Sequence, residues 1–212
     1  MKYDVENKYS WLTFAQSYLT IANAACENVL TGSKNSLTDP MNFEYRAAEL
    51  FIPVVFNIKH GVEVFIKTLA FIIKDKYSRD VRHDIKSLFS TLKSIIPKDL
   101  KPFEGADGNK VTQEEIDQIP QSLQKLEELV LKYYHCDFVF KGRRVVDIYD
   151  RMNDLFRYPD DKAEIVIDLN LVDRELIGVI QNDIQNFYRV FNALGYIFDV
   201  SLQNSNNANQ GK

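Results

Sequence analysis

The chain has 212 residues, which is enough for one domain with a sizeable hydrophobic core. Its formal net charge of −4 excludes a global basic field of the kind that attracts nucleic acid, so contact with RNA or DNA would need a local basic patch. Helix breakers are few, with 8 glycines and 6 prolines, and this composition favours an all-helical fold.

The two cysteines, Cys26 and Cys136, lie far apart in the sequence, and neither has a CxxC partner. This spacing indicates neither a metal site nor a disulfide framework, and it favours two small buried thiols in a reducing compartment. The opening residues MKYDVENKYS lack the apolar segment of a secretory signal. We therefore expect a soluble cytoplasmic protein that has no metal, no nucleotide and no other cofactor.

The N-terminal part predicts one helix followed by a loop. Apolar residues recur at three- and four-residue steps from about Lys8 to Leu30, and Gly32 is placed to end that helix. The polar segment Ser33–Pro40 is then expected to be a loop.

The central helix is predicted from about Asn42 to Lys74, with Pro53 expected to kink it or to divide it in two. Within it, the apolar stretch Glu49–Lys74 is expected to organise the fold, because its aliphatic residues cover one broad arc of the helix. The other side is a mixed polar and aromatic strip, called the seam below, which contains Glu49, Phe56, His60, Glu63, Lys67, Phe71 and Lys74. A purely solvated face would not need two phenylalanines, so the seam is expected to face a ligand or a second copy of the chain. Its charges also argue against a membrane span.

A short helix is predicted at His83–Ile96, where Pro97 stops it and where His83 or Asp84 caps its start. The segment Pro97–Lys110 is expected to be a mobile loop, because it contains two glycines. Thr112 and Glu115 then form a capping box that starts a new helix. Pro120 should break that turn, and a further helix should run to about Tyr134.

The C-terminal part predicts two more helices. A short extended pair is expected around Lys141–Gly142, followed by a helix at Val145–Phe156 that ends before Pro159. The segment Ala163–Leu171 is expected to be extended. Asp173 should cap a final helix that ends near Val200, and the polar tail, residues 203–212, is expected to be disordered beyond a single domain of residues 1–202.

Two groups of residues are candidates for chemistry. His60, Glu63 and Lys67 follow one another at helical spacing, which suits proton transfer or phosphate binding, or equally an ion pair and a histidine bonded across a helix interface. Arg143, Arg144, Arg151 and Arg157 form a local basic concentration, which nearby aspartates partly neutralise. We read it as a solvated helix face or as a contact for phosphate or RNA. Motifs for nucleotide binding, acyl transfer and EF-hand calcium binding do not occur in the sequence.

Three segments in order resemble the HEPN-like helical proteins of prokaryotes. They are FNIKHGVEVFIKTLAFI (Phe56–Ile72), RHDIKSLFSTL (Arg82–Leu92) and LFRYPDD (Leu155–Asp161). The resemblance implies an up-and-down helical bundle that forms a dimer through its motif face. Many members of that family cleave RNA without metal, using an arginine followed a few residues later by a histidine. This chain departs from that pattern, because no histidine follows Arg151 or Arg157.

We therefore expect an all-α, HEPN-like bundle that forms a homodimer through the seam of the central helix. The resemblance implies a non-catalytic role in prokaryotic stress, defence or mobile-element conflict, by binding RNA or a partner protein. The alternative is a metal-independent endoribonuclease in which Arg157, His60 and Glu63 converge across the dimer. Further binding or interface residues are expected to be Phe56, Lys67, Phe71, His83, Asp84, Arg151 and Tyr158.

Overall fold

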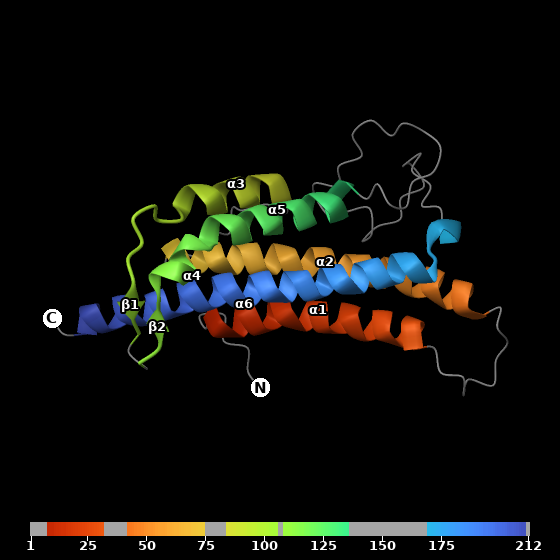
Figure 1. Ribbon diagram of the computed structural model, residues 1–212, viewed down its shortest axis with the longest axis horizontal. Coiled ribbons are helices and arrows are strands. Elements are labelled where there is room, and N and C mark those ends of the chain that lie inside the picture. Colours follow the sequence, from red (N-terminus) through yellow and green to blue (C-terminus); the bar gives the residue numbers. More distant parts are fainter. Residues whose placement is uncertain (1–7, 32–41, 75–83, 106–107, 136–168, 211–212) are drawn as a thin grey trace.

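The computed structural model describes residues 8–31, 42–74, 84–105, 108–135 and 169–210, which form an elongated helical bundle (Figure 1). The helices are α1 (Lys8–Thr31), α2 (Asn42–Lys74), α3 (Ile85–Ile95), α4 (Gln113–Asp117), α5 (Ile119–His135) and α6 (Arg174–Gln210). The remaining elements are strands β1 (Phe103–Glu104) and β2 (Lys110–Val111) and the 3₁₀ turn η2 (Leu169–Leu171). The predicted all-α fold is confirmed.

Helix α2 lies at the centre of the bundle, where it contacts α1, α3, α5 and α6. Its apolar arc is buried as the sequence predicts, with residues such as Phe51, Ile58 and Leu69 fully inaccessible to solvent. The ring of Phe65 stacks on Phe191 of α6, with ring centroids 3.7 Å apart. Burial of these side chains is the main favourable term in folding, since each one removes apolar surface from water.

Helix α1 runs antiparallel to both of its long neighbours. Along α6, Gln16 bonds to Asn192 and Asn23 bonds to Gln185, so residue numbers rise on one helix as they fall on the other. At the far end, the Arg174 guanidinium donates to the carbonyl oxygen of Leu30. These polar contacts line the exposed edge between the two helices and set their register.

Pro53 does not divide the central helix, so that part of the prediction is wrong. Helix α2 continues through Pro53 from Asn42 to Lys74. A proline in a helix removes a hydrogen bond to the carbonyl four residues earlier, here that of Glu49. Glu49 and Pro53 are both exposed, so water can bond to that carbonyl and the helix can continue.

Three predicted caps are confirmed. The Asp84 side chain accepts hydrogen bonds from the backbone N–H groups of Lys86 and Ser87 at the start of α3. Thr112 and Glu115 form the reciprocal capping box of α4. The Asp173 carboxylate accepts from the Leu176 N–H at 2.7 Å at the start of α6. Such bonds occupy N–H donors that have no partner within the helix.

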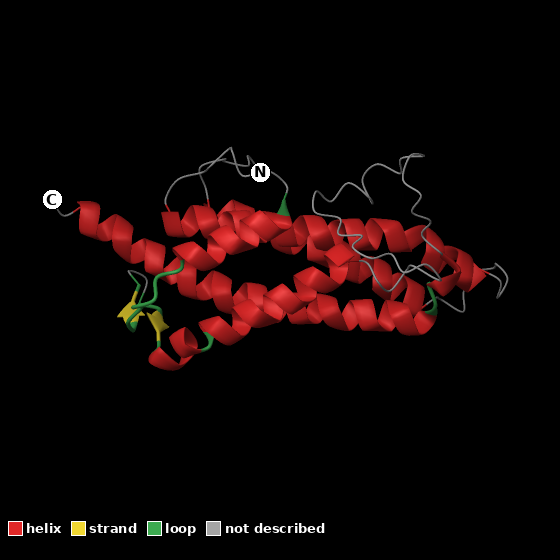
Figure 2. Ribbon diagram, turned by 90° about the horizontal axis from the view of Figure 1, so that it is seen from above, coloured by secondary structure: helices red, strands yellow, loops and turns green. Residues whose placement is uncertain are grey.

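The structure corrects two further predictions. The glycine-containing segment is not simply a loop, because β1 and β2 pair antiparallel with Phe103 opposite Val111, and Gly108 adopts φ of 81° in the connection. Two-residue strands are too short to give a period-2 signal. Leu169–Leu171, the described end of the segment predicted to be extended, is a 3₁₀ turn, and residues 163–168 lie outside the described residues. Figure 2 shows the strands at the end of the molecule where α6 ends, and the Tyr196 hydroxyl donates to the Lys110 carbonyl there.

The last helix is longer than predicted. Helix α6 extends to Gln210, past the expected end at Val200 and into the polar tail. No glycine or proline occurs between Ser201 and Gln210, so no residue there forces the helix to stop. The predicted elements at residues 33–40, 141–142 and 145–156 lie outside the described residues.

Helices α1 and α2 lie close together at Gly61, which gives a test of the packing. A Cβ at Gly61 would lie 3.0 Å from the Ala15 carbonyl oxygen and 3.1 Å from the Tyr18 Cβ. We expect Gly61→Ala to lower the free energy of unfolding by about 1–3 kcal/mol, because neither neighbour can move without shifting a helix. Urea denaturation followed by far-UV circular dichroism measures the change. The matched control is Gly178→Ala, where a Cβ meets nothing within 4 Å. That substitution should raise stability by about 0.5–1 kcal/mol, and equal effects at both sites would contradict the proposed close approach.

Candidate functional site

The seam of α2 faces helix α1 of the same chain. The His60 ring stacks on Phe56 with ring centroids 5.6 Å apart, and it meets the Tyr18 ring edge-on at 4.6 Å. His60 is therefore held between an aromatic ring of its own helix and one of α1. A histidine in this position has a fixed ring orientation and only partial access to solvent.

Glu63 and Lys67 form an ion pair one helical turn apart on the same seam. The Lys67 Nζ lies 2.6 Å from Glu63 Oε1, and the side chains are 23% and 2% exposed, respectively. A carboxylate this deeply buried needs a cationic or hydrogen-bonding partner, because removal of an ion from water is costly. The pair supplies one, and Lys67 is the more exposed of the two partners.

A pocket of about 150 Å³ lies between α1 and α2 beside this ion pair. We call it the aromatic pocket, and its lining residues are Trp11, Phe14, His60, Glu63, Val64, Lys67, Thr68 and Phe71. The Thr68 hydroxyl donates to the Val64 carbonyl at 2.7 Å, so it is bonded within its own helix. The pocket is therefore mainly apolar and aromatic, with one charged group at its wall that has partial access to solvent.

The structure brings together one group of predicted site residues. His60, Glu63, Lys67 and Phe71 all line the aromatic pocket, and Phe56 packs against His60. Asp84 lies elsewhere, as the N-cap of α3. His83, Arg151, Arg157 and Tyr158 lie outside the described residues, so a convergence of Arg157 with His60 and Glu63 stays a prediction.

Sequence reasoning missed two contributions to this region. Trp11 and Phe14 belong to the apolar repeat of the first helix, and only the packing of α1 on α2 brings them to the seam. The second feature that was missed is the burial of Lys59. This side chain is fully buried, and its Nζ lies 4.5 Å from the centroid of the Tyr134 ring on α5. The Tyr134 hydroxyl also donates to the Lys59 carbonyl. The spacing of Lys59, Glu63 and Lys67 at four-residue steps was the one signal that could have suggested a shared role.

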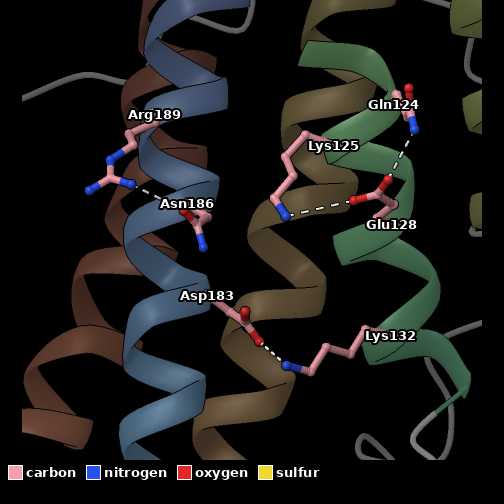
Figure 3. Close-up of polar contacts among 7 residues, drawn as sticks. All are labelled: Gln124, Lys125, Glu128, Lys132, Asp183, Asn186 and Arg189. Atoms are coloured by element: carbon pink, nitrogen blue, oxygen red, sulfur yellow. Dashed lines mark hydrogen bonds and ion pairs between the residues drawn. The ribbon is translucent and has the colours of Figure 1, made fainter. Parts of the chain in front are cut away.

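A second polar cluster joins α5 to α6 (Figure 3). Lys132 of α5 reaches Asp183 of α6 at 2.5 Å, and the Tyr133 hydroxyl donates to the same carboxylate oxygen at 3.1 Å. The other contacts in this view, Gln124–Glu128, Lys125–Glu128 and Arg189–Asn186, lie within single helices. The bridge between α5 and α6 therefore depends on Asp183.

Burial sets the acidity of two groups inside the bundle. It raises the pKa of Tyr133 well above its ordinary value, and the Asp183 carboxylate beside the phenol adds to the effect. Burial also raises the pKa of the Cys26 thiol from 9.0 to about 12, with a smaller contribution from Glu27. Both groups are therefore neutral in the folded protein at physiological pH, and the Cys26 thiol is poorly reactive.

Comparisons of the chain with protein-family models, curated proteins and solved structures find no match. The described residues also contain no cluster of His, Cys, Asp and Glu that could hold a metal ion. No helix in the described ranges has an apolar stretch sufficient to cross a membrane. The HEPN-like resemblance therefore stays a prediction from the sequence segments alone.

The ion pair of the seam gives a second test of the structure. We expect Lys67→Ala to lower the free energy of unfolding by about 1–3 kcal/mol, since it leaves the Glu63 carboxylate buried without its ammonium partner. The double variant Glu63→Gln/Lys67→Gln should recover a large part of this loss, because it removes both charges. Urea denaturation of the single and double variants measures both values. Losses of unfolding free energy that simply add in the double variant would contradict the energetic coupling between Glu63 and Lys67.

The buried thiol and phenol predict a fall in stability at alkaline pH. Unfolding returns Cys26 to an ordinary pKa near 9, so above that pH the unfolded chain binds fewer protons than the folded protein. The contribution of the neutral Cys26 thiol to the free energy of unfolding is thus complete below pH 9 and is lost as the pH rises toward 12. The raised pKa of Tyr133 likewise makes stability fall with pH above 10.0, the ordinary pKa of a tyrosine. Unfolding free energies measured from pH 7 to 11 should fall less steeply for Cys26→Ala and Tyr133→Phe than for wild type, and parallel curves would contradict the assignment.

Proposed function

We propose that this chain is a non-catalytic, HEPN-like helical protein that binds a partner protein through the aromatic pocket. The observation that carries the proposal is the pocket itself, where the rings of Trp11, Phe14 and Phe71 meet the Glu63–Lys67 pair. Tight protein contacts depend on a few apolar or aromatic anchors in well-packed pockets. The setting, in prokaryotic stress, defence or mobile-element conflict, rests on the sequence resemblance.

The burial of the candidate catalytic residues supports binding over catalysis. A general base must reach the proton that it removes, directly or through one water. Glu63 is 1% exposed and is paired with Lys67, while His60 lies between Phe56 and Tyr18. These contacts orient the two side chains toward the interior of their own chain, where an RNA strand has little access.

The distribution of charge supports a protein partner over RNA. Binding to a phosphate backbone requires several cations that are available to phosphates. Many of the described lysines instead have carboxylate partners, namely Lys67, Lys93, Lys110, Lys125 and Lys132. With a net charge of −4, the chain also repels a polyanion at long range. A second copy of the chain is one candidate for the partner, in line with the homodimer predicted from sequence.

The enzyme alternative can be tested directly on RNA. Wild type, His60→Ala and Arg157→Ala are incubated with labelled structured RNAs in the absence of divalent metal. We expect no cleavage above buffer for any of the three proteins, because His60 and Glu63 are held internally. Cleavage by wild type that both substitutions abolish would contradict the non-catalytic proposal.

Partner binding can be tested by affinity purification with matched variants. The proposal predicts that a protein, or a second copy seen by light scattering, associates with wild type and is lost with Phe71→Ala, because the pocket loses an aromatic wall. The control is Leu131→Ala on α5, which removes a side chain that is 41% exposed and does not line the pocket. Melting temperatures confirm that both variants are folded. Equal loss of binding in both, or none in either, would contradict a role for the pocket.

A further inference from the structure

We infer that the aromatic pocket is selective for a small aromatic group that carries a carboxylate, and that Lys67 binds this carboxylate. The inference deepens the proposed function, because it rests on the pocket being a binding site. It does not require that the ligand be part of a protein. It follows from the size of the pocket, from its walls and from the partly exposed Lys67 among its described lining residues.

The size and walls of the pocket suit a single ring. An apolar cavity of about 150 Å³ is large enough to take one benzene-sized molecule, and the aromatic pocket has a volume of about 150 Å³. Trp11 and Phe14 contribute rings from α1, with centroids 6.4 Å apart and planes at 89°, and Phe71 contributes a ring from α2. Aromatic rings favour edge-on and offset contacts with one another. An inserted ring can therefore make such contacts with both helices.

The accessible charge in the pocket is the Lys67 ammonium. Glu63 is more deeply buried, with 2% of its side chain exposed against 23% for Lys67. Among the described residues, the Lys67 Nζ donates a hydrogen bond only to Glu63 Oε1. An ammonium group has three N–H donors, so further donors are available to a ligand. A ligand in the pocket therefore lies next to a partly exposed lysine and a deeply buried carboxylate. This difference in exposure favours an anionic ligand group over a cationic one.

A ligand carboxylate would share Lys67 with Glu63. The two carboxylates repel each other, but the ammonium between them offsets this repulsion through charge-assisted hydrogen bonds to both. A neutral amide of the same shape forms a weaker bond to the same ammonium, because it carries no charge. Selection for the acid over its amide is therefore the property that distinguishes this site from a merely apolar hollow.

Two sources share this chemistry. One is a free aryl acid, and the other is the C-terminal aromatic residue of a protein chain, whose ring and terminal carboxylate lie close together. Recognition of a C-terminal carboxylate is a common mode of peptide binding. Phenylacetate represents the first source and N-acetyl-L-phenylalanine the second.

The experiment uses the single tryptophan of the chain. Trp11 lines the pocket, so its fluorescence reports occupancy without any label. Wild type is titrated with phenylacetate and phenylacetamide, and with N-acetyl-L-phenylalanine and its C-terminal amide. We expect saturable changes with at least one acid, and binding of its amide weaker by about tenfold or more. Lys67→Gln should bring the acid to the level of the amide, whereas Lys93→Gln, which removes another ion-paired lysine outside the pocket, should bind as wild type does.

Equal affinity for acid and amide in wild type would overturn the inference, and so would the absence of saturable binding of both acids. Selective binding that persists in Lys67→Gln would also overturn it. Where Lys67→Gln does not fold, the double variant Glu63→Gln/Lys67→Gln takes its place, and the comparison of acid with amide needs no variant. Selective binding of an acid without capture of a protein would refute only the protein-partner proposal. Capture that depends on Phe71 without selection for acids would refute only the inference made here.

Discussion

Burial of helix α2 is the constraint on which the rest of the structure depends. This helix carries the most apolar stretch of the chain, and it contacts α1, α3, α5 and α6. Each buried aliphatic side chain contributes roughly 1.5–3 kcal/mol relative to exposure, so the arrangement that covers the apolar arc of α2 is strongly favoured. Helices α3 and α5 pack on this central helix, whereas the hairpin contacts α6.

The same burial explains why the polar residues of α2 are paired. Lys59, Glu63 and Thr68 are buried, so each must find its partners inside the protein. Glu63 has Lys67, and the Thr68 hydroxyl bonds to the backbone of its own helix. Lys59 lies over the Tyr134 ring of α5. Burial between helices thus accounts for the contacts of these three polar residues.

The aromatic pocket follows from how α1 covers the seam. The two helices come close at Gly61, where the absence of a side chain allows contact. Farther along α2, the large rings of Trp11, Phe14 and Phe71 face one another around a space of about 150 Å³. Small and large side chains on one helix pair thus create both a tight contact and a hollow. The hollow has an ammonium group at its wall, and this combination of shape and charge is the basis of the binding role that we propose.

The sequence by itself determined the helices and their starts, because these depend on local physics. Hydrophobic periodicity predicted α1, α2, α3, α5 and α6, and short polar side chains at Asp84, Thr112 and Asp173 predicted the caps of α3, α4 and α6. It also placed His60, Glu63 and Lys67 on one face of α2, since helical spacing is a local property. Only the tertiary structure decided what that face meets. The contact of Trp11 and Phe14 with the seam joins residues far apart in the chain, and no local pattern encodes which helix packs on which face. The burial of Lys59 and Glu63, and the greater exposure of Lys67, follow from that packing.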